Sequence, residues 1–150
     1  MKSISKNRKA WHDYHIEDKV EAGLVLKGSE VKTLRQGQGS IAEGYALIRD
    51  NQAWLLNVYI PALKHASYMN HVERRDRKLL LKQKEIEKLD AATRQKGYTL
   101  VPLELYFDDN NRVKIELGLG KGKSSYDKRS SEKEKSAKRE VREAKNASRR

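Results

Sequence analysis

Residues 98–119, YTLVPLELYFDDNNRVKIELGL, decide the fold that this sequence predicts. Apolar residues recur at every second position in two runs, which is the period of a β-strand. They are Val101, Leu103, Leu105 and Phe107 in the first run and Val113, Ile115, Leu117 and Leu119 in the second. The polar residues 108–111 between the runs are typical of a turn. The stretch therefore predicts an antiparallel hairpin with one apolar face.

The segment before this hairpin carries the signals of a helix. Within residues 83–96, Ile86, Leu89 and Thr93 have helical spacing, and Gly97 is a typical helix stop. Leu79–Leu81 fits both a buried strand and a short helix, and the sequence leaves both open.

Two further strands are expected at Tyr45–Asp50 and Ala53–Ile60, with a turn between them and Pro61 as the end of the second. We expect one face of the second strand to consist of Trp54, Leu56, Val58 and Ile60.

The chain upstream predicts a strand with alternating apolar residues from Val20 to Leu26, and Tyr14 and Ile16 form a short run that pairs with it. A short helix is expected after it, with Ser29 as N-cap and Gly37 at its end.

These elements predict a mainly β protein with helices. About six short antiparallel strands and two or three helices, the larger helix preceding the last hairpin, favour an OB-type β-barrel. A flat sheet covered by helices is the alternative.

The domain organisation follows from charge and apolar content. The chain has 150 residues and a net charge of +12, and residues 121–150 hold 12 Lys/Arg against 5 Asp/Glu. That segment has too few apolar residues to offset its ordering entropy. We expect residues 1–120 to form the barrel and residues 121–150 to form a basic tail, disordered when free and helical with a partner. The excess charge favours an anionic partner, most simply a nucleic acid.

Several classes are disfavoured by composition. Cysteine is absent, which excludes disulfides and thiolate metal sites and is compatible with the cytoplasm. No apolar run is long enough to span a membrane, and the N-terminus has no signal-peptide core. We expect no metal and no cofactor.

Gly122-Lys123-Ser124 matches the end of a phosphate-binding P-loop, but the motif also needs a glycine at position 117, where Leu117 stands. No apolar helix follows. We expect Gly118, Gly120 and Gly122 to let the strand end fray into a flexible connection.

The stretch His71–Lys84, HVERRDRKLLLKQK, predicts a surface that faces RNA. Six basic residues surround three leucines, and basic groups around a small apolar ledge suit unstacked bases. Glu21 and Glu30 are each open to two interpretations: a solvent-exposed or helix-capping charge, or a carboxylate that accepts hydrogen bonds from bases.

The four histidines, His12, His15, His65 and His71, are expected at exposed polar positions. A ribonuclease that uses His12 and His15 as general acid and base is the enzymatic alternative.

Together the motifs resemble the SsrA-binding protein family, also called small protein B. The resemblance rests on five blocks in the family's order, and they are Asn7–Ala10 with His12–Tyr14, Glu21–Gly23 with Leu26 and Gly28, Glu30–Arg35, Arg77–Leu81 with Glu85 and Ile86, and Tyr98–Tyr106 with Lys114 and Gly120–Arg129. The resemblance implies an OB-type barrel that binds the tRNA-like domain of transfer-messenger RNA and brings it to ribosomes stalled on messages without a stop codon. It also implies a tail that enters the empty messenger channel, and a monomeric cytoplasmic adaptor with no catalytic residues. A general OB-fold ribosome-assembly factor is the remaining alternative.

The resemblance also assigns residues. Asn7, Glu21 and Leu80 match transfer-messenger RNA sites, and Glu30, Lys32, Arg77 and Lys78 lie in the same blocks. The decoding-centre signature corresponds to Lys121, Gly122, Lys123, Asp127, Lys128 and Arg129. Ser124 departs from the family pattern, which has a second lysine there, and this places one phosphate contact in question.

Overall fold

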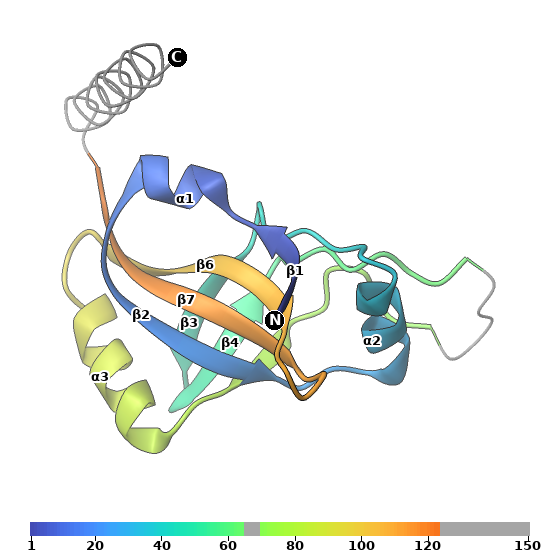
Figure 1. The fold of residues 1–150 in the computed structure, drawn as a ribbon. Helices are drawn as coiled ribbons and strands as arrows, with labels where there is room; N and C mark the ends of the chain where they lie inside the picture. Colours follow the sequence, from blue (N-terminus) through green and yellow to red (C-terminus); the bar gives the residue numbers. More distant parts are fainter. Residues whose placement is uncertain (65–69, 124–150) are drawn as a thin grey trace, which may run out of the picture.

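The computed structural model describes residues 1–64 and 70–123, and within them the chain forms a closed antiparallel barrel (Figure 1). Its strands are β1 (Lys2–Lys6), β2 (Tyr14–Leu24), β3 (Tyr45–Arg49), β4 (Gln52–Leu56), β5 (Arg77–Leu80), β6 (Tyr98–Phe107) and β7 (Val113–Gly122). Its helices are α1 (Arg8–Asp13), α2 (Gly28–Arg35) and α3 (Gln83–Thr93).

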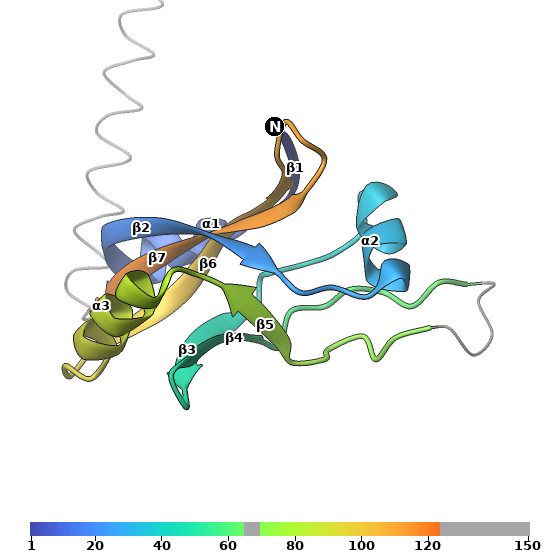
Figure 2. The same ribbon diagram turned by 90° about the horizontal axis from the view of Figure 1, so that it is seen from below.

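The strand order is β1-β6-β3-β4-β5-β2-β7. The last strand, β7, also pairs with β6, and this pairing closes the ring. The prediction of an OB-type barrel with a helix before the last two strands is confirmed. Figures 1 and 2 place α3 and α2 at opposite ends of the barrel, with α1 beside β2 and β6.

The predicted last hairpin is present as β6 and β7, which pair from Tyr98 with Lys121 to Phe107 with Val113. Its turn is organised by Asp108, whose Oδ1 accepts hydrogen bonds from the backbone N–H groups of Asn110 and Arg112, each at 2.9 Å. The apolar face differs from the prediction, because the pairing with β7 shifts between Pro102 and Glu104.

That irregularity changes which side of β6 faces the barrel. Leu100, Leu105 and Phe107 belong to the main core, while Val101 and Leu103 pack with Ala10 of α1 in a second apolar cluster. One strand therefore contributes to two cores, and the expectation that Val101, Leu103, Leu105 and Phe107 share one face is wrong.

The same correction applies to the second predicted strand. It ends at Leu56 because Asn57 has a φ of 59°. Ala53 and Leu55 point into the barrel before this residue, and Val58 and Ile60 do so after it. Trp54 consequently lies on the outer surface, on the face opposite to the predicted one.

The N-terminal elements β1 and α1 were not predicted. β1 pairs with the end of β6, and α1 begins at the N-cap Asn7. Tyr14 and Ile16 belong to the same strand as Val20, so they do not form a separate strand that pairs with it.

α2 has the predicted acidic residue in its first turn, but its N-cap is not the predicted residue. The Glu30 carboxylate accepts a hydrogen bond from the backbone N–H of Lys27 at 2.8 Å, so Lys27 is the N-cap residue and Ser29 lies inside α2. Gly37, directly after the C-cap of α2, has a φ of 78°, the left-handed conformation that ends a helix. α3 ends at Thr93, three residues earlier than predicted, and Gly97, with a φ of 86°, lies in the turn that leads into β6. Leu79 and Leu80 lie in β5, which settles the open choice in favour of a strand.

Candidate nucleic-acid interface

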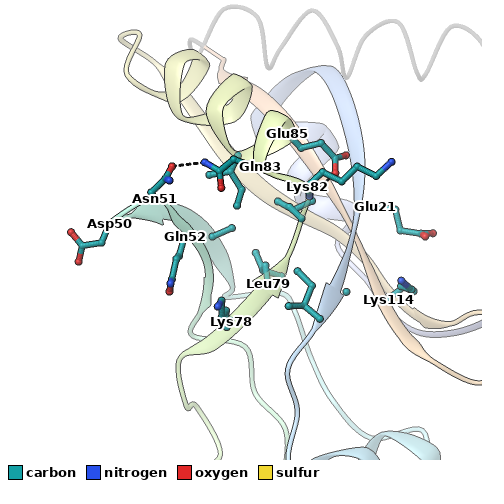
Figure 3. A pocket seen from close by; sticks show the side chains of 15 residues that line it. Glu21, Asp50, Asn51, Gln52, Lys78, Leu79, Lys82, Gln83, Glu85 and Lys114 are labelled. Carbon is teal, nitrogen blue, oxygen red and sulfur yellow. Dashed lines mark hydrogen bonds between the residues drawn. The ribbon is translucent and has the colours of Figure 1, made fainter.

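A groove of about 700 Å³ opens on the outer surface where β2, β5 and β7 meet the β3–β4 turn and the start of α3 (Figure 3). Three of the seven residues expected to bind transfer-messenger RNA line it: Glu21, Lys78 and Leu80. The fold thus brings together residues that are far apart in the sequence.

Leu80 is the apolar floor of this groove, with 52% of its surface exposed. It faces outward because Leu79, its neighbour in β5, fills the barrel interior at 1% exposure. A Cβ on Gly23 of β2 would lie 3.3 Å from the Cβ of Leu80, so the absence of a side chain there lets Leu80 lie against β2.

Lysine side chains surround this leucine. Lys78, Lys82 and Lys114 all line the groove, the first two from the stretch that runs from β5 into α3 and the third from β7, and Figure 3 shows them around its rim. The carboxylates of Glu21, Asp50 and Glu85 line the groove as well, so its rim presents both charges. The lysines can hold phosphates and the carboxylates can accept hydrogen bonds, while a base or sugar contacts the apolar floor.

Glu21 supplies a hydrogen-bond acceptor at the edge of the groove. It lies opposite Glu116 of β7, which lies opposite Glu104 of β6. Like charges placed directly opposite each other do not stabilise a sheet, so this row is not explained by folding.

Tyr106 orients the Glu21 carboxylate by donating a hydrogen bond from its hydroxyl to Oε2. Burial, this hydrogen bond and the nearby carboxylates together raise the pKa of Tyr106 well above its usual range. The phenol is therefore protonated at neutral pH and always acts as a donor, which leaves the other Glu21 oxygen for a ligand.

The β3–β4 turn forms the far wall. Asp50 and Asn51 have φ values of 52° and 61°, the pairing typical of a tight two-residue hairpin turn. Gln83 of α3 donates a hydrogen bond to Asn51 Oδ1 at 2.9 Å, drawn as a dashed line in Figure 3, which joins the turn to the helix.

Glu30 and Arg77, both expected to touch RNA, are 0% exposed. Arg77 Nε donates to Glu30 Oε2 at 2.5 Å, and the rest of the guanidinium donates to the carbonyls of Val58, Glu73 and Arg75. Neither side chain can contact an RNA on the surface, so both of these assignments are corrected. Their role is to hold α2 and residues 73–77 together.

Asn7 is likewise structural in its contacts. It is 6% exposed, its amide donates to the Pro102 carbonyl at 3.0 Å, and its Oδ1 accepts from the N–H of Ala10 at 3.3 Å. These bonds hold the start of α1 against β6, and the assignment of Asn7 as an RNA contact stays a prediction. Lys32 is exposed on α2 but does not line the groove.

Lys121, Gly122 and Lys123 lie at the end of β7, far along the strand from the groove. The N–H of Gly122 donates to Gly97 O and that of Lys123 to Asp13 O, each at 3.0 Å. These bonds contradict the expectation that the strand frays at its glycines. Ser124, Asp127, Lys128 and Arg129, with the rest of the predicted tail, lie outside the described residues.

The histidines differ in solvent exposure. His71 is 7% exposed and bridges Ser29 and the Ile60 carbonyl, at 2.9 Å each, so its expected exposure is wrong. Because a carbonyl only accepts, His71 donates from Nε2 and accepts the Ser29 hydroxyl at Nδ1. His12 contacts Asp13 at 3.0 Å, and His65 lies outside the described residues.

Residues 1–64 and 70–123 contain neither a cluster of metal-binding side chains nor a membrane-spanning helix. No group of three or more acidic or histidine side chains there is placed to hold a metal ion. None of the helices in that part of the chain is long and apolar enough to cross a membrane.

The sequence did not single out Tyr106, Asn51 or Gln83. Tyr106 could have been found from its position two residues after Glu104 on the same strand face. Asn51 was identified only as a turn residue, and nothing in the sequence indicates its contact with Gln83.

Comparison with known proteins settles the family. The sequence model described as "SmpB protein" matches residues 4–147. The chain belongs to the SmpB family. The SsrA-binding protein of Thermobifida fusca is 54% identical over 143 residues, which is 95% of this chain and 89% of that protein. The SsrA-binding protein of Streptomyces coelicolor is 49% identical over 140 residues, covering 93% of this chain and 87% of that protein.

A solved chain of the SmpB family has the same fold. It is described as "tmRNA-SmpB: a journey to the center of the bacterial ribosome", and it aligns with a TM-score of 0.67 at 44% identity. The alignment covers 80% of this chain and 84% of the solved one. The recognition of the family from sequence blocks is confirmed.

Proposed function

We propose that this chain is an RNA-binding adaptor of trans-translation, which binds the tRNA-like domain of transfer-messenger RNA and delivers it to ribosomes stalled on messages without a stop codon. The observation that carries this proposal is the groove, in which an exposed leucine is surrounded by lysines. Its relatives are named for binding SsrA RNA, and the similar solved chain is described together with transfer-messenger RNA and the bacterial ribosome.

The chemistry of the groove fits this partner. Lys78, Lys82 and Lys114 neutralise phosphates, Leu80 contacts a base or sugar, and the free oxygen of Glu21 accepts a hydrogen bond from a base amino group or a 2′-hydroxyl. We propose that Glu30, Arg77 and Asn7 support this surface from within.

The end of β7 supports a second contact. Lys121, Gly122 and Lys123 stand at the opposite end of the β2–β7 ladder from the groove. We propose that they contact the decoding centre together with Asp127, Lys128 and Arg129, while the remaining basic tail occupies the empty messenger channel. On this proposal residues 1–120 and 121–150 are two functional units.

The proposed role is that of an adaptor without catalysis, acting as a single chain in the bacterial cytoplasm. Incubation of the purified protein with RNA tests the absence of catalysis. Cleavage that is lost on His12→Ala or His15→Ala would instead support a ribonuclease.

The decisive experiment is to capture RNA from cells with the purified chain and to sequence it. We expect transfer-messenger RNA to dominate. Precursor ribosomal RNA would contradict the proposal and support an assembly factor. Lys114→Ala should then weaken binding and lower the slope of log K against log salt by about 0.7 to 0.9, the value for one phosphate contact. Arg94→Ala, which removes a charge that pairs with Asp90 on α3, is the control with no expected change.

A truncation separates the two units. Because β7 continues to Gly122 and Lys123 is bonded to α1, the cut is placed after Lys123. The shortened chain should keep its affinity for transfer-messenger RNA and lose ribosome rescue. Loss of RNA affinity in this folded fragment would contradict the division.

A further inference from the structure

The outer surface of β3 and β4 continues the groove with an aromatic and a basic side chain. Trp54 lies opposite Lys78, and Gln52 lies opposite Arg49 across the β3–β4 pair. Since Lys78 and Gln52 both line the groove, Trp54 and Arg49 are the next residues along the sheet.

Arg49 covers Trp54. Its guanidinium carbon lies 5.3 Å from the centre of the indole ring, within the range of a cation–π contact. No acidic side chain in the described part of the chain forms an ion pair with Arg49 or Lys78, so the positive charge beside this ring is uncompensated.

The barrel core does not require this tryptophan. Ala53 and Leu55, on either side of it, fill the interior at 0% and 1% exposure, and the half-buried Trp54 lies on the opposite face of β4, outside the core cluster. A large aromatic ring beside an arginine without an ion-pair partner is a surface on which nucleobases stack, because bases stack both on aromatic side chains and on guanidinium planes.

We propose that Trp54 and Arg49 form a stacking platform for an unpaired nucleotide of the RNA that occupies the groove, with Lys78 holding its phosphate. The platform rests on the proposed function, since it serves the same RNA. It extends the contact surface from the rim of the groove across β5 to β4 and β3, and it adds a base contact to the phosphate contacts of the lysines.

The molecule contains a matched pair that serves as a control. The guanidinium carbon of Arg74 lies 5.2 Å from the centre of the Tyr59 ring, and Arg74 also donates hydrogen bonds to Asn57. Although Arg74 belongs to the stretch expected to face RNA, neither it nor Tyr59 lines the groove. A general effect of losing an arginine or a cation–π contact should appear equally in Arg74→Ala, whereas loss of the platform should appear only in Arg49→Ala.

The experiment uses the full chain with Trp11→Phe, which leaves Trp54 as the one tryptophan, because the sequence holds two. Transfer-messenger RNA is added while Trp54 emission and its quenching by acrylamide are recorded, and a gel-shift titration measures binding independently. We expect emission to fall and acrylamide access to decrease with the same dissociation constant as the gel shift. Arg49→Ala should weaken binding about tenfold and Arg49→Lys by less, while Arg74→Ala leaves it unchanged.

Three results would overturn the platform. In the first, RNA binds by gel shift but Trp54 emission and acrylamide access stay constant, which leaves the proposed function standing. In the second, Arg49→Ala and Arg74→Ala weaken binding equally. In the third, the RNA fails to bind by either readout, which removes the proposed function and the platform with it. Thermal melting of each variant confirms that its fold is intact before binding is compared.

Discussion

Arg77 Nε and Glu30 Oε2 lie 2.5 Å apart, and both side chains are fully shielded from solvent. Arg75 reaches the other oxygen of the same carboxylate at 2.7 Å. The charges of Glu30, Arg75 and Arg77 are compensated by one another and by backbone groups. Together they fix α2 to residues 75–77, which lead into β5 on the side of the barrel that carries the groove.

Arg77→Ala should destabilise the protein by about 3–5 kcal/mol, because it removes the fully buried cation that pairs with the buried Glu30 carboxylate. Urea denaturation measures the change. The exposed Arg74→Ala should stay within about 0.5 kcal/mol of the wild type. A double variant, Glu30→Leu with Arg77→Met, removes both charges and should recover most of the loss; a double variant as unstable as Arg77→Ala would contradict this account.

Acid should unfold the protein partly through Glu30. Burial alone would raise the pKa of Glu30, but the hydrogen bonds from Arg75, the Lys27 backbone and Arg77 outweigh it and lower the pKa below its ordinary value of 4.5. A depressed pKa in the folded state contributes stability above pH 4.5, and this stability is lost as the pH falls through the lower folded value. Denaturation midpoints measured from pH 7 to pH 3 should therefore fall more steeply in the wild type than in the Glu30→Leu, Arg77→Met variant.

The neighbouring leucines of β5 should separate folding from binding. Leu79→Ala removes a side chain that is 1% exposed and should cost about 2–5 kcal/mol of stability. Leu80→Ala removes one that is 52% exposed and should change stability by little, while transfer-messenger RNA affinity drops. Melting temperatures and gel-shift titrations of the two variants give the comparison, and equal affinities for Leu80→Ala and wild type would exclude the groove floor as a contact.

Glycines at the end of β7 should differ in tolerance. A Cβ at Gly120 would lie 2.9 Å from the Tyr14 Cβ, which is held close to its backbone, so Gly120→Ala should cost about 1–3 kcal/mol. The nearest atom to a Cβ at Gly122 is the Gly97 oxygen at 4.0 Å, and Gly122→Ala should fold normally. Thermal melting checks both. Reduced ribosome rescue by the folded Gly122→Ala protein would support its proposed place at the decoding centre.

Tyr106→Phe should weaken RNA binding by releasing the Glu21 carboxylate, with the ring still filling its place. We expect a loss of about three- to tenfold in affinity, corresponding to roughly one hydrogen bond. A double-mutant cycle with Glu21→Gln gives the test: if the two changes act through one another, their effects on affinity fall short of additivity. Additive effects would show that Tyr106 does not act through Glu21.

The barrel was predictable because most of its strands keep a simple alternation, and the helix signals at Gly37 and Gly97 are local. The two apolar faces that were assigned wrongly contain irregularities that alternation cannot show. At Asn57 a positive φ reverses the facing of the residues that follow, and at Leu103 the strand pairing shifts.

The candidate site was predictable only where residues are exposed. Glu21, Lys78 and Leu80, which the family resemblance assigned, do lie together, but the pattern of Leu79–Leu81 alone does not show which leucine faces outward. Glu30 and Arg77 carry charges that normally indicate a surface, and only their mutual pairing explains their burial. β1 and α1 were missed because their residues are mostly polar, and their stability comes from pairing and packing with β6, far along the chain.

The β2–β7 ladder determines how the groove and the end of β7 are spaced. Glu21 pairs with Glu116 near the groove and Tyr14 pairs with Gly122 at the far end, so six residues of β7 span roughly 20 Å at about 3.3 Å each. Because the two strands are hydrogen-bonded along this length, the pairing of their residues fixes the distance between the two ends. Lengthening both strands by two residues would move the two proposed RNA contacts apart and keep their facing, whereas lengthening by one would turn the groove residues to the opposite side. Where the ladder is regular, the distance between the two sites changes in steps of about 7 Å, and the irregularity between Ile16 and Asp18 shows that a one-residue change needs a bulge in β2.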